Sequence, residues 1–312
     1  MKFSPFYWVF SSVVILAGVG LMGTAAAMEY KGRDEEGESI IETFESVDNL
    51  KVEVSSCSLV LKSSENAKEC SVEFVNAPTN PKMYMDGNTL HIEQKQKGTF
   101  RLISFGNWQK SGKLIITVPE QKLDEVAISL GFTNGNEISA LSCKKLQLDC
   151  GVGDMTMDQI QISKELDLDG GTGDLFLYDV TVDGKCDMDL GVGEIEADGF
   201  TVAKETNIDL GTGDCFIQNA VMGMTDMDCG VGDIQMISVQ FLGDTEIRQG
   251  TGDIKLDIAG SSDDYSVKTE DGTGDVKIDG ENINTLKNMD AKYSINIKCG
   301  VGDVDICFVD EN

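Results

Sequence analysis

The fold of this chain is decided by residues 148–177, which read LDCGVGDMTMDQIQISKELDLDGGTGDLFL. The tetrapeptide Gly-Val-Gly-Asp at 151–154 returns as Gly-Thr-Gly-Asp at 171–174, a spacing of twenty residues. Further copies, with Val or Thr second and Asp or Glu fourth, begin at positions 191, 211, 230, 250, 272 and 300. A fixed period of this length is typical of proteins built from stacked coils.

Apolar and polar residues alternate on both sides of each tetrapeptide. In the copy at 151–154, Leu148 precedes Asp149, and Met155 and Met157 flank Thr156. A period of two indicates half-buried strands, and glycine permits the tight corner between them. Because one coil cannot bury its apolar side alone, successive coils must stack. The predicted corner residues of four copies are Gly151, Gly153, Asp154, Gly171, Gly173, Asp174, Gly191, Gly193, Glu194, Gly211, Gly213 and Asp214.

The sequence therefore predicts an all-β chain, a single-stranded β-solenoid with coils of about twenty residues, preceded by a hydrophobic N-terminal helix. We divide it into a hydrophobic segment at 1–28, a charged linker at 29–39, an N-terminal β cap with the first coils at 40–128, and the repeat solenoid at 129–312. Residues 40–128 lack the tetrapeptide but contain alternating segments. An open solenoid end would invite strand addition, so we expect this region to form a cap.

The segment 1–28 predicts export. No charged residue lies between Lys2 and Glu29, and about 20 apolar residues suffice to span a bilayer as a helix. Two alternatives remain. We favour an uncleaved transmembrane anchor over a signal peptide cleaved at about Ala27. Both predict an extracytoplasmic chain, membrane-anchored in the first case and secreted in the second.

The composition excludes several functions. A formal net charge of −29 disfavours nucleic acid, whose phosphates are bound by Lys and Arg. His91 is the only histidine, which removes most acid–base and metal chemistry that depends on imidazole. The nine cysteines form no CxxC pair. Cys57 and Cys70 lie in neighbouring strand-like segments and could form a disulfide, and the others are interpreted as core residues.

Two columns of carboxylates are expected to run along the stack. In the first, an Asp beside each glycine corner can accept backbone N–H groups. The second has members Asp149, Asp169, Asp189, Asp209 and Asp228. Like charges about 4.8 Å apart in water repel by about 0.9 kcal/mol per pair before screening. We consider two ways to offset this repulsion. One is calcium, a candidate cofactor whose ligands would be this second column. The other is partial neutralisation by Lys144, Lys164, Lys185 and Lys204.

Several segments together resemble a known family. They are residues 44–54, the strand at 87–92, the strand at 114–119 and the Gly-x-Gly-Asp coils. The chain resembles the bacterial "putative adhesin" family with β-strand repeats, which is related to the toast-rack domains of envelope-stress proteins. This resemblance implies a solenoid after residue 40 and implies no catalytic residues.

Three functional hypotheses follow. The first is a non-enzymatic exported surface module, an adhesin that binds a surface glycan or an envelope protein. The second is a membrane-anchored sensor or scaffold domain, as the toast-rack resemblance implies. The third is a polysaccharide-active enzyme, which is disfavoured because catalytic carboxylates interrupt a repeat, whereas here the carboxylates are the repeat. No nucleic-acid partner is expected, and the membrane is reached through 1–28.

Overall fold

The computed structural model describes residues 39–77, 81–95, 112–133 and 135–309. The chain divides into two units, Met1–Glu38 and Ser39–Asn312, and all described residues lie in the second. The predicted hydrophobic helix at 1–28 and nearly all of the linker lie outside the described residues. In the part that is described, no helix has the length and apolar character needed to cross a membrane. The second unit is all-β.

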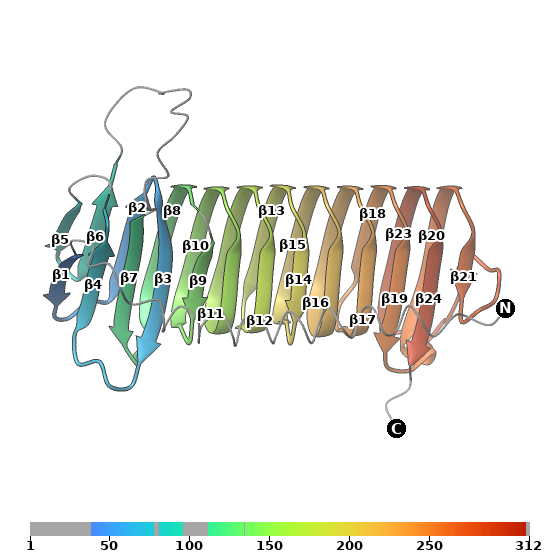
Figure 1. The fold of residues 1–312 in the computed structure, drawn as a ribbon. Helices are drawn as coiled ribbons and strands as arrows, with labels where there is room; N and C mark the ends of the chain where they lie inside the picture. The colour runs from blue at the N-terminus through green and yellow to red at the C-terminus, as the bar shows by residue number, and fades with distance from the viewer. Residues whose placement is uncertain (1–38, 78–80, 96–111, 134, 310–312) are drawn as a thin grey trace, which may run out of the picture. The chain divides into compact units, whose positions relative to one another are not determined.

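The middle of this unit consists of stacked coils, each with a strand before and a strand after the Gly-x-Gly-Asp corner (Figure 1). These strands are β8 (Leu123–Phe132), β9 (Asn136–Ser139), β10 (Ser142–Val152), β11 (Met155–Thr172), β12 (Leu175–Val182), β13 (Lys185–Val192), β14 (Ile195–Asp198), β15 (Thr201–Thr212), β16 (Cys215–Val231), β17 (Ile234–Phe241), β18 (Thr245–Thr251) and β19 (Ile254–Ala259). All pairings among them are parallel, and Leu148 pairs with Leu168, which pairs with Met188. Each residue therefore lies beside its equivalent in the next coil, which creates columns of similar side chains.

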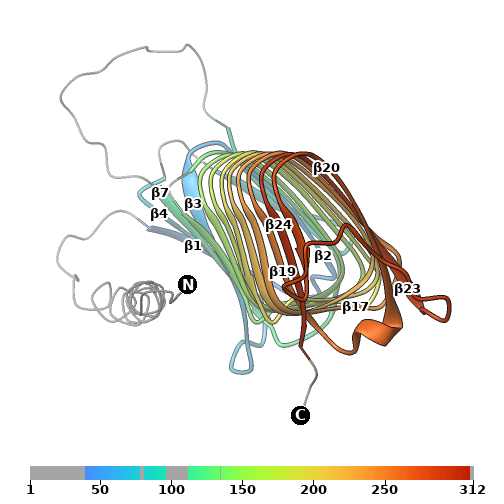
Figure 2. The same cartoon turned by 90° about the vertical axis from the view of Figure 1, so that its right-hand side faces the viewer.

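The interior of the stack is filled by the apolar half of each strand. Met155, Leu175, Ile195, Cys215 and Ile234 form one buried column immediately after the corners. Viewed along the stack, successive coils overlie one another around this shared interior (Figure 2). The apolar columns hold the stack together because each coil covers the apolar edge of its neighbour.

Glycine is required at the corners because neighbouring coils approach closely there. Gly213 has a φ of +145°, and a Cβ at this position would lie 1.9 Å from the carbonyl oxygen of Gly193. Several coils also turn at a second corner, where Gln159, Asp179 and Asn219 adopt left-handed φ values of 57°, 51° and 52°. This corner could not be predicted from the sequence, because no one residue type recurs at it.

The C-terminal end of the stack does not follow sequence order. Its elements are η1 (Ser262–Asp264), β20 (Tyr265–Thr273), β21 (Val276–Ile278), β22 (Thr285–Leu286), β23 (Tyr293–Val301) and β24 (Val304–Val309). Strand β23 pairs with β18 on one side and with β20 on the other. Strand β24 likewise lies between β19 and β21. The last coil of the chain is therefore inserted inside the stack, and the preceding coil forms its end (Figure 1).

The N-terminal end uses the same insertion. Its strands are β1 (Ser39–Phe44), β2 (Asn49–Val54), β3 (Cys57–Ser64), β4 (Cys70–Val75), β5 (Lys82–Asp86), β6 (Thr89–Gln94) and β7 (Gly112–Pro119). Strand β2 pairs with both β6 and β8, and β3 pairs with both β7 and β9. Antiparallel strands β1, β4 and β5 then extend the sheet beyond this outer coil. The outer coil at the N-terminal end, β6–β7, is thus paired on both sides.

Two buried polar side chains form hydrogen bonds between coils near the N-terminal end. The Asn136 amide accepts the backbone N–H of Leu59 at 3.1 Å and donates to the Thr133 hydroxyl at 2.8 Å. The Gln94 Oε1 accepts the backbone N–H groups of Ser55 and Ser56. Both buried amides therefore make the hydrogen bonds that burial of a polar group requires.

All nine cysteines are free thiols, so the disulfide alternative for Cys57 and Cys70 is wrong. Cys57 pairs with Gly112 at the start of β7, whereas β4 runs antiparallel to β7 with Ser71 beside Thr117. The two cysteines therefore lie at opposite ends of β7 and on different sides of it. Burial raises the pKa of both thiols, to about 11 for Cys57 and about 12 for Cys70. They act as small apolar core residues.

Candidate functional surfaces

The acidic residue that ends each tetrapeptide connects neighbouring coils. The Asp154 carboxylate accepts the backbone N–H of Asp174 at 3.0 Å, and the Asp174 carboxylate accepts that of Glu194 at 2.9 Å. The same bond, at 2.8 to 2.9 Å, joins Asp214 to the N–H of Asp233, Asp233 to that of Asp253, Asp253 to that of Asp303 and Asp303 to that of Asp275. These corner carboxylates therefore form a hydrogen-bonded ladder whose bonds run between coils rather than within one.

Glu194 interrupts this ladder. Its backbone N–H donates to Asp174, but among the described residues its own carboxylate makes no hydrogen bond to the N–H of Asp214. A glutamate side chain is one methylene longer than the aspartates on either side. The pKa of Glu194 is raised by partial burial and by the nearby charges of Asp174 and Asp214. The other ladder carboxylates named above each accept a backbone N–H from a neighbouring coil, and among the described residues the Glu194 carboxylate does not.

The second predicted column is also assembled by the fold. Asp149, Asp169, Asp189, Asp209 and Asp228 pair consecutively along the stack. The pKa values of Asp169 and Asp209 are raised, first by partial burial and then by neighbouring aspartates. Within the described ranges, no three Asp, Glu, His or Cys side chains converge as metal ligands would. Calcium binding at this column stays a prediction.

Two of the lysines expected to neutralise this column, Lys144 and Lys185, pair with other carboxylates instead. Lys144 pairs with Asp124 at 2.5 Å, and Lys185 pairs with Glu205 at 2.5 Å, so neither contacts the column. The pairing geometry places Lys185 beside Glu205 because both occupy a separate outward column. Arg248 instead ends the aspartate column, with contacts of 3.0 Å to Asp228, 2.5 Å to Asp226 and 3.1 Å to Glu246. Arg248, which was not assigned this role from the sequence, neutralises the Asp228 end of the column.

The strands that follow the corners present a different surface. On it, coils with acidic side chains alternate with coils with aromatic ones. We name this surface the aromatic–acidic face and define it by Asp158, Phe176, Tyr178, Glu196, Asp198 and Phe216. All six side chains are half-buried, and each occupies an outward position of its strand. This face could not be predicted from the sequence, because Phe176 and Phe216 are forty residues apart and are brought onto one face, on either side of Glu196, only by stacking.

Comparison with known families shows which family the chain belongs to. The family model described as Toastrack DUF4097 matches residues 47–307. The chain belongs to the Toastrack family. The match covers nearly all of the described coils of this Toastrack chain, including the inserted coils at both ends. Comparison with curated proteins finds no match.

Several solved structures are similar to this Toastrack chain at low identity. One is a "putative cell adhesion protein" of Clostridium sporogenes ATCC 15579, with 16% identity, a TM-score of 0.26, and coverage of 88% of this chain and 100% of the other. A "putative adhesin" of Parabacteroides distasonis ATCC 8503 has 14% identity, a TM-score of 0.38, and coverage of 88% and 98%. A "putative lipid binding protein" of the same organism has 13% identity, a TM-score of 0.31, and coverage of 88% and 98%. Because these TM-scores are low, no functional conclusion is taken from them.

Exposed β-branched residues form a ridge along the Toastrack corners. Val152, Val192, Val231 and Val301 occupy the second position of the tetrapeptide, and their exposed fractions are 40%, 51%, 51% and 52%. Threonine occupies this position in the coils between them. A depression of about 470 Å³ lies at the start of the ridge, between Phe132 and Thr172. Its lining combines Phe132 and Val152 with Thr133, Thr172 and Asp154, and the Asp154 carboxylate already accepts a backbone N–H from the next coil.

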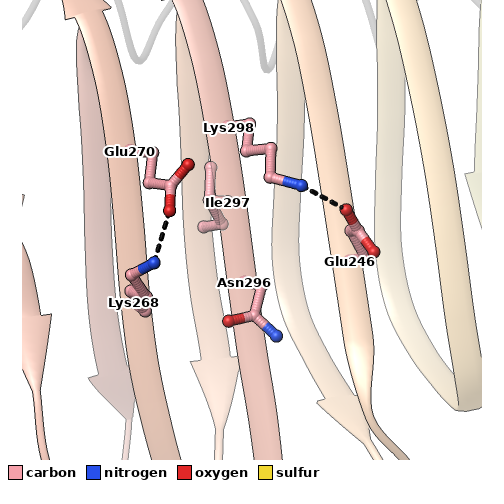
Figure 3. A pocket seen from close by; sticks show the side chains of 6 residues that line it. All are labelled: Glu246, Lys268, Glu270, Asn296, Ile297 and Lys298. Atoms are coloured by element: carbon pink, nitrogen blue, oxygen red, sulfur yellow. Dashed lines mark hydrogen bonds and ion pairs between the residues drawn. The ribbon is translucent and has the colours of Figure 1, made fainter.

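Another depression lies where the inserted coil meets its neighbours (Figure 3). Its volume is about 220 Å³, and it is lined by Glu246, Lys268, Glu270, Asn296, Ile297 and Lys298. Lys298 forms an ion pair with Glu246 at 2.8 Å, and Lys268 pairs with Glu270. The charges that line this depression thus neutralise one another. We interpret it as a contact region of the inserted coil rather than as a ligand site.

Proposed function

We propose that this Toastrack chain is a non-enzymatic surface-binding module of adhesin type, displayed outside the cytoplasm. The observation that carries the proposal is the register of the outward columns on either side of the Gly-x-Gly-Asp corners. Charged and β-branched side chains recur at the coil spacing of about 4.8 Å along the stack, and Phe176, Tyr178 and Phe216 lie in register with carboxylates of neighbouring coils. Such a surface is suited to binding an extended partner through many similar contacts, because no single coil holds a unique constellation of groups.

The hydrogen bonds of the corner carboxylates support a role without catalysis. A glycosidase needs two carboxyl groups that are free to act as acid, base or nucleophile. Here Asp154, Asp174 and Asp214 each accept a backbone N–H from the next coil. The description of the family names no reaction. We therefore assign these aspartates to the fold rather than to chemistry.

The extracytoplasmic location is part of the proposal and rests on the sequence of residues 1–28. The apolar run between Lys2 and Glu29 supports export as an anchored or secreted chain. A second candidate function, a membrane-anchored envelope-stress sensor or scaffold, is favoured by membership of the Toastrack family. It requires a membrane protein as partner and requires the anchor.

A capture experiment tests these alternatives. The purified full chain is immobilised and exposed separately to a panel of cell-wall polymers and glycans and to a detergent extract of membranes. Each exposure is made with calcium and with EDTA. Retention of a polymer or glycan supports the adhesin function, and its loss in EDTA supports the calcium prediction for the Asp149 column.

Two other results would contradict the adhesin function. Retention of a membrane protein alone supports the sensor or scaffold function. Turnover of a glycan that is abolished by one Asp→Asn substitution contradicts the non-enzymatic assignment. The heat-unfolded chain is the control, because an acidic polymer of net charge −29 retains basic material without any fold.

A further inference from the structure

The aromatic–acidic face combines rings and carboxylates in register. Phe176 lies beside Glu196 in the next coil, and Glu196 lies beside Phe216 in the coil after that. In the adjacent outward column, Asp158 lies beside Tyr178, which lies beside Asp198. Every ring on this face therefore has a carboxylate in a neighbouring coil, about 4.8 Å away along the stack.

The carboxylates of this face have no cation partner among the described residues. Among the ion pairs of the described residues, none joins Asp158, Glu196 or Asp198 to lysine or arginine. Glu196 accepts only a weak hydrogen bond from the Tyr178 hydroxyl at 3.4 Å. Asp198 accepts amide N–H groups from Gln218 and Asn219, both at 2.8 Å. The pKa of Asp158 is raised by partial burial and by the charges of Asp179 and Glu137.

This face differs from the acidic columns on the strands before the corners. There, Lys145 and Lys185 bind Glu165 and Glu205, and Arg248 ends the aspartate column. On the aromatic–acidic face, the positions between carboxylates are occupied by rings instead of cations. A guanidinium or ammonium group bound to one of these carboxylates would lie within about 6 Å of a ring, the distance at which cation–π attraction acts.

We propose that the aromatic–acidic face binds an extended basic peptide segment of a protein partner, with arginine side chains placed between the rings of Phe176, Tyr178 and Phe216. Arginine suits the site because its planar guanidinium stacks on a ring and donates to a carboxylate at the same time. Charge complementarity favours this occupant over a second copy, whose net charge is also −29. The inference deepens the proposed binding function by assigning one face and one class of partner.

The test uses the full chain and a short synthetic peptide of alternating arginine and threonine, with a glutamine-for-arginine peptide as the control ligand. Binding is measured by isothermal titration at an ionic strength of about 0.15 M, where long-range attraction is largely screened. The double substitution Phe176→Leu with Phe216→Leu removes two rings and leaves the net charge unchanged. Two cation–π contacts are together worth about a tenfold change in dissociation constant, so we expect about tenfold weaker binding.

A matched control separates this site from general attraction to an acidic protein. Asp169→Asn with Asp189→Asn removes two charges from the other outward surface and should weaken binding much less than the ring variant does. Equal weakening by the two double variants overturns the proposal, and so does absence of binding by the natural sequence. Glu196→Gln, which keeps the side-chain shape, provides a second test if the leucine variant unfolds. We expect weaker binding, and an unchanged affinity overturns the proposal.

The same variants distinguish this inference from the broader proposed function. If the leucine double variant retains a wall polymer or glycan as well as the natural sequence does, while neither binds the arginine peptide, the inference fails and the adhesin function stands. If the natural sequence binds the arginine peptide through the two rings but retains nothing from the capture panel, the adhesin function fails and the basic-peptide site stands. If capture of a neutral glycan requires Phe176 and Phe216, the face binds a sugar rather than a basic peptide, and the inference is overturned.

Discussion

Removing one carboxylate from the corner ladder tests whether its hydrogen bonds outweigh its charge repulsion. Asp233 accepts the backbone N–H of Asp253 at 2.9 Å, and its own N–H donates to Asp214 at 2.8 Å. Asp233→Ala deletes the first of these bonds and keeps the second. A hydrogen bond to a charged acceptor contributes about 1.5–3 kcal/mol, and for the exposed Asp233 we take about 2 kcal/mol, in the lower half of that range.

Charge repulsion offsets part of this loss. Two like-charged neighbours at about 4.8 Å each repel by about 0.9 kcal/mol in water, and screening at about 0.15 M ionic strength reduces this to about 0.5 kcal/mol each. Asp233→Ala therefore relieves about 1 kcal/mol of repulsion and should cost about 1 kcal/mol net. Asp233→Asn keeps a neutral acceptor and loses the charge, so its effect on the free energy of unfolding should be close to zero.

The measurement is chemical denaturation of the purified full chain, supported by thermal melting, in which a cost of about 1 kcal/mol lowers Tm by about 2–4 °C. Glu194 provides a control in the same column, because its carboxylate makes no ladder bond to the next described coil. Glu194→Ala should be neutral or stabilising, and Glu194→Asp should add about 1 kcal/mol by restoring the bond. Equal destabilisation by Asp233→Ala and Glu194→Ala would refute this account of the ladder. The cost of Asp233→Ala should also increase with added salt, because salt weakens only the repulsive contribution.

Three further predictions concern the stack. Gly213→Ala should prevent stable stacking because its Cβ would lie 1.9 Å from a carbonyl oxygen of the neighbouring coil, whereas Gly87→Ala, with φ +59° and open space, should cost only about 1–2 kcal/mol by thermal melting. The raised pKa values of Asp169 and Asp209 mean that the folded state binds more protons than the unfolded state above the ordinary Asp pKa of 3.8. Their contribution should therefore raise Tm as pH falls from neutral through the raised pKa values, with the full gain reached below 3.8, and added salt should raise Tm at neutral pH. A chain that ends after residue 292 should become sensitive to proteolysis throughout β18 to β21, because it loses the coil between them; loss of protection confined to β20 and β21 would contradict the inserted order.

The sequence determined the repeating unit and the reason it must stack. The glycine spacing predicted coils of about twenty residues, and the alternation around Leu148 and Met155 predicted which side chains face inward. Both features depend on local chemistry: the period of a strand is two, and only glycine tolerates the corner. The same reasoning predicted the two carboxylate columns, because a fixed period and parallel stacking place equivalent residues side by side.

The roles of individual side chains were predictable only in part. The position of each corner aspartate beside a turn predicts that its carboxylate accepts a backbone N–H. It does not predict that this N–H belongs to the next coil. The partner of Lys185 could not be predicted, since lateral neighbours within a sheet decide whether it contacts an aspartate or Glu205. Phe176 and Phe216 are unremarkable in the sequence, and their common face exists only after stacking.

The order of the coils at the ends was decided by the tertiary structure alone. The sequence spacing loosens to 22 and then 28 residues before the last tetrapeptides, which indicated longer connections without indicating where they lead. In the structure, the connection after β21 leads to β23, which lies between β18 and β20. Equivalent coils offer nearly identical edges, so the local pattern fits any stacking order equally well. Only the complete stack, in which β2–β3 and β23–β24 are each paired on both sides, distinguishes one order from another.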